Sequence, residues 1–241
     1  MFRKEENRNA ATDLETEDLH IWRYDLNERD YLKEMQNPVL SMHEKRRCEE
    51  FLHEADRLRY VCIHRFVRQV LSAYLNTSAS EIEINYAKFG KPFINGNELY
   101  FSYTYRSNMA LLAISRQSEI GIDIEKMRQL QDVNTFCEFS FSIEEREILD
   151  GCTEEAFQET LFTFWTFKEA VIKALGVGLN ADLTQINLSP YFVDKTKPLR
   201  FKNDEIYTVS RLMAPEGYKA AYAMKGLTKR ILEFSYDSKD M

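Results

Sequence analysis

The sequence predicts an α+β fold built from two similar halves. Long segments with a helical period alternate with groups of short strand-like runs, and this order of elements occurs twice, about 105 residues apart. The repeated runs are Ile82–Ile84, Lys91–Phe93 and Met109–Ser115 in the first half and Ile186–Leu188, Lys197–Leu199 and Tyr218–Met224 in the second. The repeat indicates an internal duplication, and the cleft between two packed units is the natural place for a ligand.

Two long helical regions are predicted from apolar residues that recur at steps of three and four. The first covers residues 41–74, where the apolar stripe is Phe51, Ala55, Leu58, Cys62, Phe66 and Val70. The second runs from Ile143 to Leu175, with a break near Gly151, and it should end at Gly176 and Gly178 because glycine favours the left-handed end of a helix.

Strands are predicted where apolar and polar residues alternate or where short apolar runs lie between turns. They are Leu19–Leu26, Ile82–Tyr86, Leu99–Tyr105, Met109–Ser115, Ile120–Glu125, Ile186–Leu188, Leu199–Phe201, Ile206–Leu212 and Tyr218–Met224. The expected organisation is a polar tail over residues 1–18, an N-terminal half over 19–118, a C-terminal half over 119–230 and a second tail over 231–241.

The composition excludes several classes of function. The chain has 241 residues, a net charge of −7, 44% hydrophobic and 29% charged residues. An acidic balance disfavours nucleic-acid binding, but an anionic small ligand needs only a few local cations. No apolar run is long enough to cross a bilayer and no leader segment is evident, so we expect a cytoplasmic protein. The four cysteines and four histidines form no zinc or redox pattern.

The first segment that can carry chemistry is Gly121–Glu125, which reads Gly-Ile-Asp-Ile-Glu. Residues two apart on a strand face the same side, so Asp123 and Glu125 should present two carboxylates together. Adjacent carboxylates repel unless a cation neutralises them, and oxygen ligands suit Mg²⁺. Taken alone, such a pattern is more often an ordinary polar face of a sheet.

The second segment is the helix Trp165–Gly176, which contains Lys168, Glu169 and Lys173. Glu169 and Lys173 are four residues apart and share one flank, whereas Lys168 points about 100° away. An i,i+4 salt bridge on a surface helix is the commoner explanation of such a pair. The functional alternative is a third carboxylate for a metal, with lysines that face phosphate oxygens.

Together, these two segments closely resemble the signature of the 4′-phosphopantetheinyl transferases: a Gly-apolar-Asp-x-Glu strand, followed by a Trp/Phe-x-x-Lys-Glu-Ala-x-x-Lys helix. Gly90-Lys91-Pro92, Asp56-x-x-Arg59 and Phe141-Ser142-x-x-Glu145 match further motifs of this family. The resemblance covers roughly residues 19–225. The chain length suits the Sfp-type form, a monomeric pseudodimer whose two α+β halves are related by pseudo-twofold symmetry around an active-site cleft.

The resemblance implies transfer of the phosphopantetheine arm of coenzyme A to a serine of an apo carrier protein, with adenosine 3′,5′-bisphosphate as the leaving group. It implies Asp123, Glu125 and Glu169 as Mg²⁺ ligands. Lys173 would hold the α-phosphate, with Lys168 as a weaker candidate, and either Glu145 or Glu169 would accept the serine proton. The residues implied for the 3′-phosphate and adenine end are Lys45, Arg59, Lys91, Thr104 and Tyr105.

One departure lies on the strand before the Asp-x-Glu pair. The family commonly has Phe-Asn-x-Ser-His-Ser there, whereas residues 101–106 read Phe-Ser-Tyr-Thr-Tyr-Arg. Tyr105 replaces a histidine that contacts a phosphate of coenzyme A, and a tyrosine carries no positive charge near neutrality. Strand alternation should direct Arg106 to the opposite face from Tyr105.

Two alternatives to the transferase are compatible with the sequence. The chain could be a degenerate member that binds coenzyme A or a carrier protein without chemistry, an idea motivated by Tyr105. It could also be an unrelated Mg²⁺-dependent phosphohydrolase. Retention of Asp123, Glu125, Glu169 and Lys173 favours the transferase. The motifs do not choose among fatty-acid, polyketide and peptide carriers.

Overall fold

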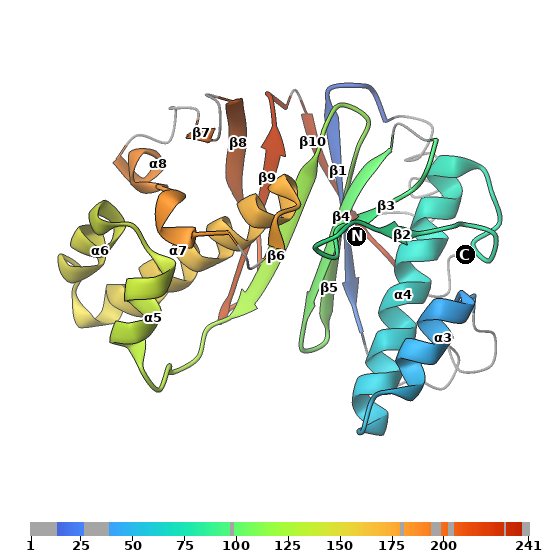
Figure 1. The fold of residues 1–241 in the computed structure, drawn as a ribbon, viewed down its shortest axis with the longest axis horizontal. Helices are drawn as coiled ribbons and strands as arrows, with labels where there is room; N and C mark the ends of the chain where they lie inside the picture. Colours follow the sequence, from blue (N-terminus) through green and yellow to red (C-terminus); the bar gives the residue numbers. More distant parts are fainter. Residues whose placement is uncertain are drawn as a thin grey trace.

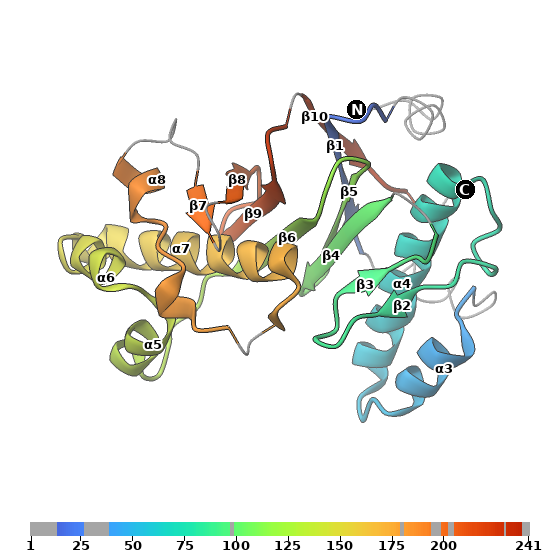
Figure 2. The ribbon, with the colours of Figure 1, turned by 45° about the horizontal axis from the view of Figure 1, so that its top comes forward.

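The computed structural model describes residues 14–26, 39–96, 99–178, 181–193, 199–201, 205–228 and 230–237. Most of the predicted N-terminal tail and the repeat residues Lys197 and Pro198 lie outside these ranges. The described residues form two four-stranded sheets, each with one 22-residue helix packed on it, and a small two-stranded sheet (Figures 1 and 2). This mixed α+β architecture agrees with the predicted fold class.

The first sheet has the strand order β10-β1-β5-β4. Its elements are β1 (Asp18–Asp25), β4 (Tyr100–Arg106), β5 (Met109–Ser115) and β10 (Arg230–Ser235), with helices α3 (Met42–Glu49) and α4 (Glu54–Leu75) and the hairpin β2 (Asn85–Tyr86) and β3 (Pro92–Phe93). Helix α4 buries Phe66, Val70 and Leu71 in a core with Trp22 and Leu112. Phe66 and Val70 belong to the predicted apolar stripe, whereas Phe51 lies before the helix and Ala55 is exposed.

The second sheet has the strand order β6-β9-β8-β7. Its elements are β6 (Ile120–Lys126), β7 (Leu199–Phe201), β8 (Glu205–Leu212) and β9 (Tyr218–Lys225), with α5 (Val133–Ser140), α6 (Ile143–Asp150), α7 (Glu154–Leu175), the 3₁₀ turn η2 (Leu183–Gln185) and α8 (Ser189–Val193). Helix α7 buries Phe164, Phe167 and Val171 against this sheet. Thr153 caps its first turn, and Gly176 ends it in the left-handed conformation.

The two sheets meet where β4 and β5 lie beside β6. A separate apolar cluster fills this junction and includes Leu19, Leu111, Ile122 and Ile124. The backbone N–H of Ile122 also donates to the Ser102 hydroxyl, 3.3 Å away. Strand β6 therefore serves both halves: its isoleucines face the junction, as predicted, and its polar residues face the other side.

The C-terminal segment corrects one prediction, because residues 231–241 do not begin a tail. Strand β10 pairs in parallel with β1 and completes the first sheet. Arg230 bonds to both carboxylate oxygens of Asp18, and the Phe234 ring stacks on Trp22 with 4.8 Å between centroids. The sequence of β10, Arg-Ile-Leu-Glu-Phe-Ser, does not alternate regularly between apolar and polar residues, so its pattern does not predict a strand.

Of the predicted strand Ile82–Tyr86, only Asn85 and Tyr86 form a strand, and the predicted strand Ile186–Leu188 is wrong. In both places the backbone carbonyls are acceptors for a buried cation of the long helix instead of ladder partners. Arg68 Nη1 donates to Ile82 O at 2.9 Å, and Lys168 Nζ donates to Ile186 O at 2.7 Å. The two segments, which resemble each other in sequence, thus also resemble each other in structure: in each, a carbonyl accepts from a buried cation of the long helix.

Each half contains a helix-capping carboxylate that is buried beside that cation. Ser41 and Glu44 form a capping box on α3, and Ser142 and Glu145 form one on α6. Glu44 Oε2 lies 2.7 Å from Arg68 Nε, and Glu145 Oε2 lies 2.6 Å from Lys168 Nζ. The four charged side chains are buried. These pairs tie each short helix to its long helix.

We expect the Glu145–Lys168 pair to contribute to folding. The Lys168→Met change leaves a buried carboxylate without its cation, which should lower the free energy of unfolding by about 3–5 kcal/mol. The Lys168→Met/Glu145→Gln double variant should lose less than the sum of the single changes. Urea unfolding of the four proteins of this cycle measures the coupling.

The matched control is the exposed pair of Lys225 and Glu205. Its cycle should give a coupling below about 1 kcal/mol, since solvent screens exposed ion pairs. Equal couplings in the two cycles would contradict the structural role assigned to Glu145 and Lys168.

Candidate active site

The site is built where α7 crosses β6 at very short range. A Cβ placed on Gly121 would lie 1.9 Å from Ala170 O and 2.4 Å from Ala174 N, so only glycine fits beneath the helix. The small side chains of Ala170 and Ala174 let the helix backbone approach to this distance. The Trp165 indole donates to Glu125 Oε1 at 3.3 Å, so α7 is also bonded to β6 one turn before Ala170.

This packing brings three predicted carboxylates into one region. Asp123 and Glu125 lie on β6 and Glu169 lies on α7, and the charges of Asp123 and Glu125 both act on Glu169. Asp123 is buried, and its Oδ2 atom has no hydrogen-bond partner among the described residues. A buried carboxylate oxygen without a partner is costly unless a ligand satisfies it.

Three cations face the carboxylates of β6. Lys173 Nζ lies 2.6 Å from Asp123 Oδ1, and it also donates to the Thr104 hydroxyl at 3.1 Å. Arg106 Nη2 lies 2.9 Å from Glu125 Oε2, and Arg128 Nη1 lies 3.5 Å from the same atom. The predicted alternation of β4 is confirmed, since Thr104 and Arg106 both turn toward β6.

Burial, followed by the charge of Asp123, raises the pKa of Glu169 to about 7, while Lys173 acts in the opposite direction. A carboxyl group with this pKa is half-protonated near neutral pH. It can therefore exchange a proton with a substrate hydroxyl, or lose its proton when a cation binds beside it.

The donor set fits a divalent cation, although the side chains do not stand ready as a metal cage. Within the part of the chain that the structure describes, no three His, Cys, Asp or Glu side chains are grouped closely enough to hold a metal ion. The unpartnered oxygen of Asp123 and the raised pKa of Glu169 both show negative charge in excess of what its neighbours satisfy. Hard carboxylate oxygens in this number suit Mg²⁺.

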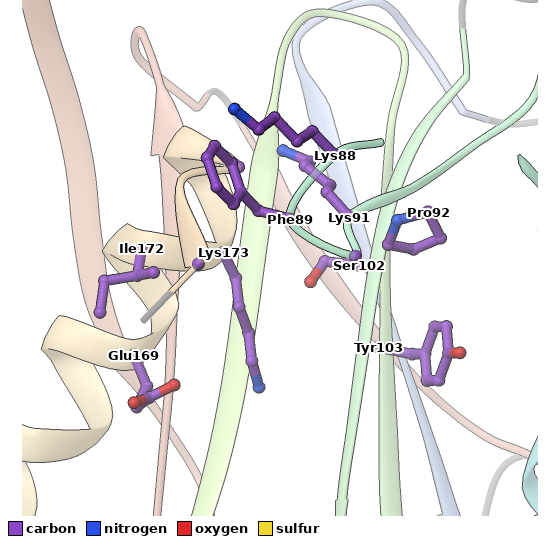
Figure 3. A pocket seen from close by; sticks show the side chains of 12 residues that line it. Lys88, Phe89, Lys91, Pro92, Ser102, Tyr103, Glu169, Ile172 and Lys173 are labelled. Carbon is purple, nitrogen blue, oxygen red and sulfur yellow. The ribbon is translucent and has the colours of Figure 1, made fainter. Parts of the chain in front are cut away.

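A cavity of about 560 Å³ opens beside these groups and is of the size that binds small molecules. Glu169, Ile172 and Lys173 border it from α7, and Ser102 and Tyr103 border it from β4. The turn between β2 and β3 closes the far side with Lys88, Phe89, Gly90, Lys91 and Pro92 (Figure 3). The cavity thus lies between the two halves, where the duplication predicts a ligand.

Lys91 connects the two sides of the cavity. Its Nζ donates to Ala174 O, 2.8 Å away, at the C-terminal end of α7, and it forms an ion pair with Glu119. Burial lowers the pKa of Lys91, and the pair with Glu119 opposes that effect. Lys91 is therefore a fixed part of the wall, whereas its neighbour Lys88 lies with its ammonium 5.1 Å from the centre of the Phe89 ring.

The structure brings only one of the five residues predicted for coenzyme A to the cavity wall, which is Lys91. Thr104 differs from the expectation, because its hydroxyl bonds to Asp123 and Lys173 within the carboxylate cluster. Tyr105 is 39% exposed and does not line the cavity. Lys45 is exposed on α3, and Arg59 pairs with Asp56 on α4.

The structure does not place Glu145 and Lys168 in this site. Both side chains are buried in the second half, where Glu145 accepts from the backbone N–H groups of Ser142 and Leu188. Lys168 uses its ammonium on Glu145 and on the carbonyls of Leu183 and Ile186. Each donor and acceptor already has a partner within the protein, so their predicted catalytic roles are corrected to structural ones.

Reasoning from the sequence does not identify several residues at the site, among them Lys88, Phe89, Ser102 and Arg128. For Lys88 and Phe89 the only indication in the sequence is that they immediately precede the Gly90-Lys91-Pro92 turn. Arg128 lies three residues after Glu125, beyond the end of β6, so no periodicity fixes where its side chain points.

The Gly121→Ala variant should separate α7 from β6 and lower the free energy of unfolding by at least about 1–3 kcal/mol, because the new methyl group meets backbone atoms. Thermal unfolding measures the loss. Gly151→Ala is the matched control, since its Cβ would lie 3.5 Å or more from its neighbours. Equal melting temperatures for the two variants would contradict the close approach.

The Glu169→Gln variant should change how stability depends on pH in metal-free protein. The carboxyl of Glu169 has a pKa of about 7 in the folded protein and a reference value of 4.5, so the folded state binds the proton more tightly than the unfolded state. The protonated carboxyl therefore stabilises the fold at low pH, and this stabilisation is lost as the pH rises from 4.5 to 7. Glutamine imitates the protonated form. The variant should match the native protein at pH 5 and be more stable at pH 8, by on the order of 2 kcal/mol.

Denaturant titrations at the two pH values, with a chelator present, give this comparison. A difference between variant and native protein that does not change with pH would show that Glu169 keeps an ordinary carboxyl pKa.

Comparison with known proteins agrees with this site. A profile of the 4′-phosphopantetheinyl transferase superfamily matches residues 119–223, which contain β6 and α7. The 4′-phosphopantetheinyl transferase HetI of Nostoc sp. (strain PCC 7120) is 27% identical over 217 residues, which are 88% of this chain and 90% of that protein. No helix among the described residues is both long and apolar enough to span a membrane.

Two further relatives carry names of the same kind. The 4′-phosphopantetheinyl transferase gsp of Aneurinibacillus migulanus is 26% identical over 71% of this chain and 70% of that protein. The L-aminoadipate-semialdehyde dehydrogenase-phosphopantetheinyl transferase of Candida glabrata is 30% identical over 59% of this chain and 57% of that protein. The region that carries the strand and helix motifs is thus similar to the 4′-phosphopantetheinyl transferase superfamily.

Proposed function

We propose that the chain transfers the 4′-phosphopantetheine arm of coenzyme A to a serine of an apo carrier protein. The observation that carries this proposal is that the charges of Asp123 and Glu125 act on Glu169, which borders a cavity between the two halves. Lys173 lies at the boundary between the carboxylates and the cavity, where it can contact both. The similarity to 4′-phosphopantetheinyl transferases supports the same reaction.

The cavity suits the pyrophosphate and nucleotide part of coenzyme A. Its wall includes Lys88, Lys91 and Lys173, which supply positive charge, and the Phe89 ring, which offers a face for stacking. Lys88 is the residue of the turn best placed to contact a phosphate, because Lys91 is already bonded to Ala174 O. Lys45 and Arg59 remain proposed for the 3′-phosphate, outside the cavity wall.

The reaction is a substitution at the β-phosphorus of coenzyme A. The serine oxygen forms a bond to this phosphorus while the bridging bond to the α-phosphate breaks, and adenosine 3′,5′-bisphosphate leaves with the electron pair. Glu169 accepts the serine proton, directly or through water, in the ionised form that it takes when a cation binds beside it. Lys173 balances the negative charge that develops on the leaving phosphate.

Mg²⁺ is the proposed cofactor, held by Asp123, Glu125 and Glu169. When bound, it would neutralise phosphate charge and help to orient the pyrophosphate. Two features of Asp123 support this proposal. Its Oδ2 atom has no hydrogen-bond partner among the described residues, and its Oδ1 atom accepts from the Thr104 hydroxyl at 3.1 Å, which orients the carboxylate.

We also propose that the chain is a monomeric, cytoplasmic protein of the Sfp type, with two halves related by pseudo-twofold symmetry. Three correspondences support the symmetry. The orders β1-α4-β4-β5 and β6-α7-β8-β9 match, and the last strand lies in the middle in both. Both long helices have 22 residues. Arg68 and Lys168 are each the fifteenth residue of their helix and contact a capping glutamate.

Removal of the carboxylate at the centre of the site tests the function. The Asp123→Ala variant should reduce transfer of the pantetheine arm by at least about 10²-fold, because it removes both a proposed metal ligand and the partner of Lys173. Mass spectrometry of a panel of apo carrier proteins, incubated with coenzyme A and Mg²⁺, detects the added mass.

The Asp25→Ala variant is the control, since Asp25 is exposed on β1 and pairs with Arg23. A chelator should stop transfer by the native protein, and added Mg²⁺ should restore it. Full activity of Asp123→Ala would remove this residue from the reaction. Coenzyme A binding without modification of any carrier would instead favour the degenerate binding module.

A further inference from the structure

In the absence of a metal ion, both carboxylates of β6 already have a counter-cation. Lys173 lies 2.6 Å from Asp123, and Arg106 lies 2.9 Å from Glu125. A site that needs a divalent ion thus begins with its charge partly compensated by its own side chains. A divalent cation that binds these carboxylate oxygens has to displace Lys173 from Asp123 and Arg106 from Glu125.

Arg106 is the unexpected member of this set. The family commonly has serine at this position of the strand, so the guanidinium is a feature of this chain. It lies at the end of β4 and is on the same face as Ser102 and Thr104. The Arg106 side chain is 40% exposed, whereas that of Glu125 is 13% exposed. The arginine can therefore swing into solvent or toward a ligand while the carboxylate stays in place.

Electrostatic repulsion determines how Arg106 responds to a divalent cation. A cation on Glu125 Oε2 repels the guanidinium that now contacts the same atom, so Arg106 has to leave it. Arg106 lies on the same strand as Ser102, which lines the cavity, although Arg106 itself does not line it. A freed guanidinium can pair with a phosphate of the co-substrate, since its planar fork matches two phosphate oxygens. The same exchange applies to Lys173, which is already part of the proposed reaction.

We propose that Arg106 is an exchangeable counter-ion: it holds Glu125 in the metal-free protein and moves to a phosphate of coenzyme A when a divalent cation binds. This inference rests on the proposed function, because it concerns the same carboxylates and the same co-substrate. Its consequence is that the cation and coenzyme A bind cooperatively. The divalent cation frees Arg106 from Glu125 for the phosphate, and the phosphate holds Arg106 away from the carboxylate that the cation needs. Such coupling between two ligands is reciprocal.

Binding of Mn²⁺, followed by electron paramagnetic resonance, tests the proposal without turnover. In the absence of coenzyme A, Arg106→Gln should bind Mn²⁺ about three- to tenfold more tightly than the native protein, because a competitor has been removed. Coenzyme A, added without any carrier protein, should tighten Mn²⁺ binding in the native protein. That enhancement should shrink in Arg106→Gln.

The Arg106→Lys variant should restore part of the cooperativity, since it keeps the charge and loses the fork. Arg23→Gln is the matched control, because Arg23 forms an exposed pair with Asp25 on β1, and it should bind Mn²⁺ as the native protein does. Thermal unfolding of each variant checks that it folds.

Two results would overturn the proposal in different ways. If Asp123→Ala abolishes Mn²⁺ binding but Arg106→Gln leaves the affinity unchanged or weaker, the metal site stands and the counter-ion role of Arg106 is wrong. If Asp123→Ala binds Mn²⁺ as tightly as the native protein, the carboxylates are not the metal site, and the proposed function loses its main support together with this inference.

Discussion

The close approach of α7 to β6 is the constraint on which the rest of this structure depends. Gly121 leaves room for the carbonyl of Ala170, and Trp165 bonds to Glu125 from the same helix. One face of the helix therefore lies directly over the strand, and Glu169 and Lys173 come down beside Asp123. The glycine of the strand motif and the alanines of the helix motif have a packing role, while the charged residues between them carry the chemistry.

The two halves use the same framework for different purposes. The twenty-first residue of α7 is Ala174, which packs on Gly121, whereas the twenty-first residue of α4 is Tyr74. Its hydroxyl meets His20 and Trp22 of β1 at 2.8 Å. An aromatic side chain thus occupies this helix position in the first half, where the second half has an alanine. The two halves therefore differ at the position where α7 packs on Gly121.

The sequence predicted most of the fold because its main elements carry local information. The stripes of α4 and α7, the break near Gly151 and the alternation of β6 all depend on neighbouring residues. The predictions from the sequence failed where contacts between distant residues determine the local structure. Ile82 and Ile186 were expected to be strand residues, but buried cations take their carbonyls, and β10 gains its place only by pairing with β1, far away in the chain. For the same reason, the motif alone could not show that Lys168 turns away from the site.

In the proposed divalent-cation site, Asp123, Glu125 and Glu169 bind one ion beside the cavity. Crystals grown with Mn²⁺ and coenzyme A can show this ion by its anomalous diffraction. One strong anomalous peak is expected in contact with carboxylate oxygens of these residues, with Lys173 no longer on Asp123 Oδ1. A peak elsewhere, or a bound coenzyme A with Lys173 still paired to Asp123 and no peak, would show that these carboxylates are not the metal site.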